Sequence, residues 1–237
     1  MFTYPVTSGI PGANLLDGLV AWYALEATGT PQSDSTGSHN LPSGSSAGSG
    51  TGKLGNGEVF PGSSLGYYIA SGSAGAFKPA DSSFTAACWA KPTAGATFSD
   101  GAFGCFTTAS GGLGWGIAIG GSDNTSWEFK RGENSGTSQP YINTGAGTLT
   151  LNAWHLLIVW RDATAQECGI QLNNNTPVTS AQVLGLGVPN YAFSVGSVIS
   201  NPFVGTVDEA AYWSRALGVD DRALLWNGGA GITYSSL

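Results

Sequence analysis

Two carboxyl groups close together on one strand would permit glycoside hydrolysis, because one serves as the acid and the other as the nucleophile, about 5 Å apart. Asp208 and Glu209 are adjacent, so in an extended strand we expect them to point to opposite faces. Glu128 has no acidic residue two positions away, and Asp162 and Glu167 are separated by a predicted turn. We therefore expect that the protein is not an enzyme.

Histidine and cysteine offer little further chemistry. Neither histidine lies in a nucleophile motif such as G-x-S-x-G, and His155 lies inside an apolar run, where we expect a hydrogen-bonded core or groove residue. Cys88, Cys105 and Cys168 show no CxxC spacing, which excludes a zinc site or a disulfide framework. We expect buried, small hydrophobic side chains, with one bridged pair as the alternative in an oxidising medium.

Carbohydrate binding needs aromatic rings that stack on sugar faces, with amide or carboxylate groups nearby. The candidates on predicted strands and loops are Tyr67, Tyr68, Trp127, Tyr141 and Asn143. Most of the eight tryptophans must serve the core, and any of these aromatic side chains can do the same. The candidates indicate a class of ligand without locating a site.

The composition narrows the class of protein. The 237 residues include 37 Gly and 11 Pro, with 10% charged and 41% hydrophobic residues, which favours short strands and turns over long helices or disorder. The net charge is -7 and no basic cluster exceeds Lys130-Arg131, so we expect no nucleic-acid binding. No run approaches about 18 apolar residues, so we expect no membrane insertion. The start, MFTYPVTSGIPGANLLDG, predicts no export by the usual secretory route.

These residues must be positioned by about a dozen short strands, because apolar runs alternate with turns rich in Gly, Asn, Ser and Pro. The predicted strands are 19–25, 57–60, 66–70, 83–92, 114–120, 126–131, 148–151, 154–162, 167–173, 193–197 and 205–213. The run 154–160 is apolar on both alternating sets apart from His155, which predicts a central strand covered on both sides. Residues 215–229 predict one helix, and the Ser/Gly run 43–52 predicts a surface loop.

The resulting fold class is all-β: an antiparallel β-sandwich with one short C-terminal helix. We expect an extended N-terminal arm over residues 1–14, followed by a single sandwich domain over residues 15–237. An extended arm can add a strand to a neighbouring subunit.

Six segments occur in a specific order: GLVAWYAL, DSTGSHNL, GKLGNGEVFPGSS, SFTAACWAKP, WHLLIVW and FVGTVDEAAYWSRALGVDDRALLWNGG. In order and spacing they resemble the laminin G-like domain of the concanavalin A-like lectin/glucanase superfamily, as found in phage virion proteins. The resemblance covers about residues 15–234 and implies a jelly-roll antiparallel β-sandwich of two curved sheets, with ligands bound at loops or on the concave face. Glycosidases of that superfamily carry an E-x-D-x-(x)-E strand, which this sequence lacks.

The resemblance also implies a candidate calcium site. In related domains, the Asp of the DSTG-like turn and the Asp of the "DE" strand meet around one Ca²⁺, and those positions are Asp34 and Asp208 here. Asn40 is a further candidate oxygen ligand. In the alternative interpretation, Asp34 organises an Asx-type turn and Asp208 caps a strand end.

Members of the superfamily bind glycans, bind proteins, act as spacers or build phage particles, so the fold does not select a function. The missing export signal and carboxylate pair favour a non-enzymatic phage virion structural protein, a head decoration or tail accessory subunit. Its expected partners are other virion proteins or copies of itself, with host-surface glycans as further ligands. The alternative is a free carbohydrate-binding lectin module or a surface adhesion protein, located outside the cell by a non-classical route.

Overall fold

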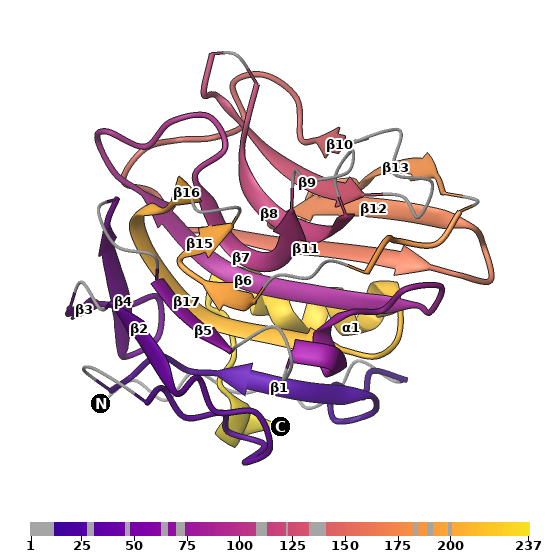
Figure 1. Ribbon diagram of the computed structural model, residues 1–237, viewed down its shortest axis with the longest axis horizontal. Helices are drawn as coiled ribbons and strands as arrows, with labels where there is room; N and C mark the ends of the chain where they lie inside the picture. Colours follow the sequence, from indigo (N-terminus) through magenta and orange to yellow (C-terminus); the bar gives the residue numbers. More distant parts are fainter. Residues whose placement is uncertain are drawn as a thin grey trace.

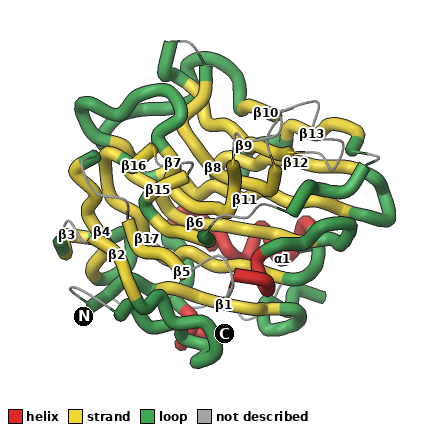
Figure 2. The backbone as a smooth tube through the Cα atoms, viewed as in Figure 1, coloured by secondary structure: helices red, strands yellow, loops and turns green. Residues whose placement is uncertain are grey.

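The computed structural model describes residues 12–27, 31–45, 48–62, 66–69, 74–107, 113–121, 123–132, 141–182, 184–188, 192–198 and 201–237. Two largely antiparallel sheets pack face to face, and one short helix, α1, covers the outer face of one of them (Figures 1 and 2). The predicted all-β sandwich with a short C-terminal helix is therefore confirmed. Within the described ranges, no helix has the length and apolar character needed to cross a membrane.

The eight-stranded sheet has the order β13-β12-β11-β6-β17-β4-β3, and β1 pairs with β17. Its strands are β1 (Leu19–Tyr23), β3 (Ser49–Thr51), β4 (Asn56–Pro61), β6 (Phe84–Pro92), β11 (His155–Asp162), β12 (Glu167–Leu172), β13 (Val178–Ala181) and β17 (Val204–Trp213). The last strand of the chain is central to this sheet, because β17 pairs with β6 along one edge and with β4 and β1 along the other.

The nine-stranded sheet has the order β10-β9-β8-β7-β14-β5-β2, and a small hairpin, β15-β16, joins it through β7. Its strands are β2 (Ser43–Ser45), β5 (Gly66–Ile69), β7 (Gly101–Thr107), β8 (Leu113–Gly120), β9 (Ser126–Gly132), β10 (Tyr141–Asn143), β14 (Phe193–Val195), β15 (Ser197–Val198) and β16 (Asn201–Pro202). The helix α1 spans Val219–Trp226, and short 3₁₀ turns span Ala74–Phe77, Asn227–Gly229 and Tyr234–Ser236.

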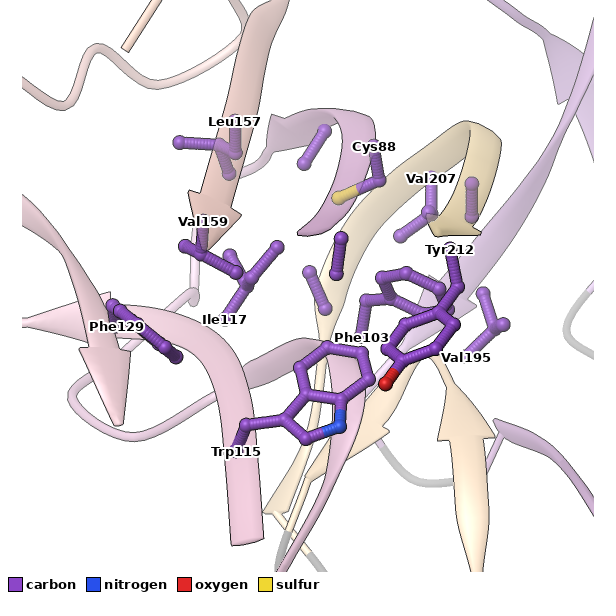
Figure 3. Close-up of a cluster of buried hydrophobic side chains, with 14 of the residues drawn as sticks. Cys88, Phe103, Trp115, Ile117, Phe129, Leu157, Val159, Val195, Val207 and Tyr212 are labelled. Atoms are coloured by element: carbon purple, nitrogen blue, oxygen red, sulfur yellow. The ribbon is translucent and has the colours of Figure 1, made fainter. Parts of the chain in front are cut away.

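The main core lies between the sheets, where the inward-facing residues of both meet. Figure 3 shows Trp115 and Ile117 of β8 against Leu157 and Val159 of β11, with Tyr212 of β17 beside them. Strand side chains alternate between faces, so each strand contributes every second residue to this core. The tightly packed aromatic rings explain why the chain folds despite its many glycines.

A second apolar cluster lies on the other face of the eight-stranded sheet, under α1. Leu156, Ile158 and Trp160 of β11 join this cluster, whereas the alternate residues of β11 face the main core. The prediction that 154–162 forms a central strand covered on both sides is therefore confirmed, since β11 lies between β12 and β6. The Arg222 guanidinium of α1 lies 4.4 Å from the ring centroid of Trp160, which helps to hold the helix on the sheet.

Hydrogen bonds join the first described residues to Arg215 and to the helix α1. The Asn14 backbone N–H donates to the Asp221 carboxylate at 2.8 Å, and Arg215 binds the Asn14 carbonyl at 2.6 Å and Asp221 at 2.8 Å. The side chain of Leu15 is buried in the second cluster. Of the predicted arm, residues 1–11 lie outside the described residues, and the domain boundary at residue 15 stays a prediction.

Three element predictions need correction. The Ser/Gly run 43–52, predicted as a loop, forms the edge strands β2 and β3, because backbone pairing needs no large side chains. Residues 148–151 form no strand, since the Thr148 hydroxyl closes a turn on the Gly145 carbonyl at 2.7 Å. The strands β7, β10, β13 and β16 have no predicted counterpart.

Candidate functional site

The outer face of the nine-stranded sheet carries polar side chains at its β9-β10 end. On β9, Trp127 points into the main core, so Glu128 and Lys130, which alternate with it, point outward. The strand β10 pairs with β9 so that Tyr141 lies opposite Lys130 and Asn143 lies opposite Glu128. Directly opposite residues on one face have Cβ atoms about 4.5–5.5 Å apart, so these four side chains are neighbours.

Two exposed aromatic rings flank the charged pair. Tyr141 is 60% exposed and Phe98 is 52% exposed. The Lys130 ammonium lies 5.0 Å from the Phe98 ring centroid and 2.7 Å from the Glu128 carboxylate. Lys130 therefore lies between the two rings. We call the surface formed by Phe98, Glu128, Lys130, Tyr141 and Asn143 the Tyr141 face.

The charges of this surface balance each other. Glu128 is only 2% exposed, and Lys130 is its ion-pair partner, so the buried carboxylate is compensated. Asn143 is half-buried, and its side-chain oxygen accepts the Gly145 N–H at 3.1 Å, which fixes the orientation of the amide. The Tyr141 face thus combines apolar rings, a neutralised ion pair and an oriented amide.

The β15-β16 hairpin bounds the Tyr141 face on the side of β7 and β8. A Cβ atom added to Gly101 would lie 2.2 Å from the Cβ of Val198, and one added to Gly116 would lie 2.7 Å from a Val198 methyl carbon. Val198 therefore packs directly on the backbone of these strands, which only glycine permits at that distance. The hairpin thus occupies the outer face over β7 and β8, whereas at the β9-β10 end Tyr141 is 60% exposed beside a Lys130 side chain that is only 13% exposed.

The predicted sugar-contacting residues divide into three groups. The prediction of Trp127 as an exposed platform is wrong: its side chain is 0% exposed and packs edge-on against His155 at 5.8 Å, because its phase on β9 directs it into the core. Tyr141 and Asn143 lie side by side on the outer face of β10. Tyr67 and Tyr68 lie on β5, but their side chains fall outside the described residues.

The sequence analysis did not assign Phe98, Glu128 or Lys130 to a site. Glu128 and Lys130 form the polar half of an alternating strand, so their common face was visible in the sequence. Phe98 lies between β6 and β7 in a turn closed by Asp100, whose carboxylate accepts the Thr97 N–H at 2.8 Å. A turn has no side-chain periodicity, so the sequence held no signal for this ring.

Asp34 is the centre of a turn beside β1. Its carboxylate oxygens accept four backbone N–H groups, at 2.8–3.2 Å, and one hydroxyl: the N–H groups of Trp22, Thr36, Ser38 and His39 and the hydroxyl of Thr36. Asn40 accepts the Asp34 N–H at 2.8 Å. Asp34 thus organises an Asx-type turn, as the alternative interpretation had it.

Asp208 and Glu209 lie on the same face of β17, which corrects the expectation that they point to opposite faces. Asp208 pairs with Trp89 of the neighbouring strand β6, and Ala211 pairs with Ala87. Two residues of β17 therefore lie between these pairs where β6 has only one, so β17 carries one extra residue. Glu209, with φ of 46°, occupies this β-bulge. Both acidic side chains consequently face the layer that contains α1, whereas Val207 and Ala210 on either side face the main core.

The two buried carboxyl groups have different surroundings. Asp208 accepts the N–H groups of Lys53 at 2.7 Å, Leu54 at 2.9 Å and Glu209 at 2.8 Å. Glu209 accepts the indole N–H of Trp22, and its other oxygen has no hydrogen-bond partner among the residues that the structure describes. Burial raises the pKa of Asp208 to about 7, against the effect of its three backbone donors, and raises the pKa of Glu209 to about 8. Glu209 therefore retains its proton at neutral pH.

These surroundings do not fit the implied calcium site. Both carboxylate oxygens of Asp34 and both of Asp208 accept N–H groups, whose positive ends repel a cation. The two side chains share no hydrogen-bond partner, since Asp34 binds the turn 34–39 and Trp22, whereas Asp208 binds residues 53, 54 and 209. Within the described part of the chain, no group of three His, Cys, Asp or Glu side chains is placed to hold a metal ion.

Histidine and cysteine are structural, as expected. His155 is buried, and its ring nitrogen Nε2 lies 3.0 Å from the Thr150 carbonyl oxygen, while burial lowers its pKa. Cys88, Cys105 and Cys168 are buried in the main core and are not joined to one another by disulfides. Burial raises the pKa of the Cys168 thiol to about 11, so it stays protonated and unreactive at neutral pH.

Comparisons with solved structures find the same sandwich in proteins of low sequence identity. Domain 4 of AbnA, a GH43 extracellular arabinanase from Geobacillus stearothermophilus in complex with arabinotriose, has a TM-score of 0.61 and 20% identity, covering 86% of this chain and 96% of that chain. Trypanosoma rangeli sialidase in complex with sialic acid has a TM-score of 0.63 and 14% identity, covering 91% and 34%. The binding domain of Paraclostridial Mosquitocidal Protein 1 has a TM-score of 0.63 and 13% identity, covering 90% and 52%.

This chain therefore spans about a third of the sialidase and half of the toxin binding domain, and the likenesses show the fold alone. A search of curated proteins found no significant match. A family model described as the concanavalin A-like lectin/glucanases superfamily, of the laminin G type, matches residues 63–221, well over half of the chain. The chain belongs to this laminin G-like family of the concanavalin A-like lectin/glucanases superfamily.

Proposed function

We propose that the protein is a non-enzymatic glycan-binding module and that the Tyr141 face is its sugar contact. One observation carries the proposal: Tyr141 and Phe98 are both more than half exposed, and they stand on either side of the Lys130–Glu128 ion pair. Exposed apolar side chains that gather on one surface beside polar residues mark binding sites, whereas single exposed ones are ordinary. Their position beside hydrogen-bonding groups is the combination that sugar recognition uses.

Each component of the Tyr141 face matches a part of a sugar. The aromatic rings stack on the C–H face of a pyranose or furanose ring. The Lys130 ammonium donates hydrogen bonds to hydroxyl oxygens, and the Asn143 amide adds a polar contact at the edge. The ion pair carries no net charge, so a neutral sugar is the expected ligand. Both strands are held in a sheet, so little conformational entropy is lost on binding.

The structural neighbours support the proposal in one respect. Domain 4 of the arabinanase was solved with arabinotriose, and the toxin fragment is described as a binding domain. The same sandwich therefore presents ligand-binding surfaces in other proteins. The residues of this chain must supply the specificity, because the fold is shared by many functions.

The carboxyl groups near the Tyr141 face support a non-enzymatic role. Hydrolysis needs two carboxyl groups that flank the sugar bond. Glu128 is nearly inaccessible and paired with Lys130, and the Asp100 carboxylate is turned back onto Thr97. Asp208 and Glu209 lie on the other sheet. A release of reducing ends from oligosaccharides that stops in Glu128→Gln would overturn the non-enzymatic part of the proposal.

The virion role expected from the sequence stays a prediction, as do its partners, other virion proteins or copies of this chain. In a particle, a glycan-binding face on each subunit would attach the particle to a host surface. Electron microscopy of particles labelled with an antibody against this protein tests that role. Glycan binding can be tested separately, on the isolated protein.

The test of the Tyr141 face is a glycan array followed by calorimetric titration of the best neutral glycan. We expect Tyr141→Ala and Phe98→Ala each to weaken binding at least about tenfold, because each removes a stacking ring. Tyr141→Phe keeps the ring and should retain most of the affinity. Leu151→Ala, which changes an exposed residue elsewhere, is the matched control. Unchanged binding in both ring-deleting variants would sink the proposal.

A further inference from the structure

A hollow lies between the loop that follows β3 and the last residues of the chain. Its volume is about 590 Å³, within the range of about 300–1,000 Å³ typical of small-molecule sites. We call it the Lys53 hollow; it is lined by Lys53, Leu54, residues 227–233 and Ser236. It belongs to the layer that covers the eight-stranded sheet, whereas the Tyr141 face lies on the nine-stranded sheet.

The hollow has a single charged side chain, Lys53, among its lining residues, all of which are described. The Lys53 ammonium lies 4.5 Å above the Trp89 ring and forms no ion pair with any described residue. Burial lowers the pKa of Lys53, as expected for a cation that is partly withdrawn from water. A partly buried cation that has no ion-pair partner among the described residues suits an anionic ligand group, which would compensate its charge.

The position of Lys53 is fixed before any ligand arrives. Asp208 accepts the N–H groups of Lys53 and Leu54, and the Gly52 N–H donates to the Gly55 carbonyl at 3.1 Å, which closes the loop. Beneath the ammonium, the Trp89 ring stacks on Trp226 with centroids 5.5 Å apart. The buried β-bulge of β17 thus anchors the loop that carries the cation. Such preorganisation is characteristic of binding sites.

The wall formed by residues 227–233 and Ser236 includes three glycines and three polar side chains, together with the apolar Ala230 and Ile232. A Cβ atom added to Gly231 would lie 3.1 Å from the Trp89 indole nitrogen and 3.2 Å from a Leu54 methyl carbon. Glycine therefore lets this segment approach the loop closely. Thr233 and Ser236 add hydroxyl groups, and Asn227 adds an amide that donates to the Gly231 carbonyl at 2.9 Å. This wall suits a ligand rich in hydroxyl groups.

We propose that the Lys53 hollow is a second ligand site, and that it binds a sugar carrying a carboxylate, of the uronic acid type. The carboxylate pairs with the Lys53 ammonium, and the ring hydroxyls face the wall formed by residues 227–233. One ammonium balances the single charge of a carboxylate, and no arginine or second lysine lines the hollow to hold a phosphate dianion. The volume also exceeds what a small inorganic anion would fill.

The test is a calorimetric or NMR titration of the full chain with galacturonic acid and glucuronic acid. We expect at least one of them to bind, and the corresponding neutral sugar, galactose or glucose, to bind at least tenfold more weakly. Lys53→Met should weaken uronic acid binding at least tenfold, whereas Lys53→Arg, which keeps the charge, should retain most of it. Lys91→Met is the matched control, since the Lys91 ammonium lies 5.0 Å over Trp154 outside the hollow.

Four results would overturn the proposal. Neither uronic acid binds; Lys53→Met binds as tightly as the parent protein; Lys91→Met loses as much affinity as Lys53→Met; or inorganic phosphate and acetate bind as tightly as the uronic acids. A thermal melt of each variant checks that it is folded. Tyr141→Ala should leave uronic acid binding intact, so failure of this site and failure of the Tyr141 face can be told apart.

Discussion

The outer faces of both sheets carry aromatic and acidic side chains, but the aromatic rings are buried on one face and exposed on the other. On the eight-stranded sheet, Trp22 and Trp213 are buried beneath α1 and residues 227–236, and Glu209 is enclosed with them. On the nine-stranded sheet, Tyr141 and Phe98 stand in solvent beside a charged pair. Aromatic side chains are thus buried on one face and exposed on the other, whereas acidic side chains are buried on both faces, Glu128 as the partner of Lys130. The covering layer, and not residue type, makes the difference.

The largest expected effect is a difference in the free energy of unfolding between a variant of the covered face and a variant of the Tyr141 face. Trp213→Ala should lower the free energy of unfolding by about 3–5 kcal/mol, because it empties a buried site and leaves the Leu15 carbonyl without its indole donor, now at 2.7 Å. Phe98→Ala should change it by less than about 0.5 kcal/mol. Urea denaturation measures both values. Similar losses in the two variants would show that Phe98 is as structural as the covered tryptophan.

A pH series tests the enclosed carboxyl groups. Their pKa values in the folded protein are raised above the ordinary carboxyl range, so the folded state holds more protons than the unfolded chain, and stability is lost as pH rises from about 4 to about 8. We expect the melting temperature to be about 5 °C lower at pH 9 than at pH 5.5. Glu209→Gln should reduce this difference, while Glu128→Gln on the open face should leave it. If the melting temperature of Glu209→Gln depended on pH as steeply as that of the parent protein, the raised pKa of Glu209 would be refuted.

The smallest expected effect concerns calcium. Because the oxygens of Asp34 and Asp208 are occupied by N–H donors, we expect EDTA to shift the melting temperature by less than about 1 °C. Differential scanning calorimetry with added Ca²⁺, and again with EDTA, measures the shift. A melting temperature that rises with Ca²⁺, and no longer rises in Asp34→Ala, would restore the site that the family resemblance implied.

Long apolar strands were the part of the fold that the sequence predicted well. The run that became β11 is apolar on both faces, and it lies in the middle of a covered sheet. The helix prediction over 215–229 was too long at its start, because α1 begins only at Val219, where Asp221 accepts the Gly218 N–H at 3.1 Å. A strongly periodic or continuous apolar pattern predicts a strand well, whereas the residues at which helices and strands begin and end depend on local hydrogen bonds.

The site was predicted less completely, for identifiable physical reasons. Tyr141 was named, but whether a strand residue faces core or solvent depends on phase, and the phase of β9 turned Trp127 inward. Phe98 reaches the same surface from a turn, so no periodic pattern connected it with Lys130. Asp208 and Glu209 share a face only because of a bulge, and a bulge shifts the alternation by one residue without a mark in the sequence.

The central place of β17 has a consequence for biosynthesis. During translation the eight-stranded sheet lacks its central strand until residues 204–213 leave the ribosome. The strands β4 and β1 pair with β17 and not with β6, so β17 alone joins them to the rest of the sheet. The strands β6, β11, β12 and β13 can pair with one another before then, but β4 and β1 have no place in the sheet until β17 is made. Pairing of strands so distant in sequence slows folding. Chaperone binding to nascent chains should accordingly persist until the final strand emerges.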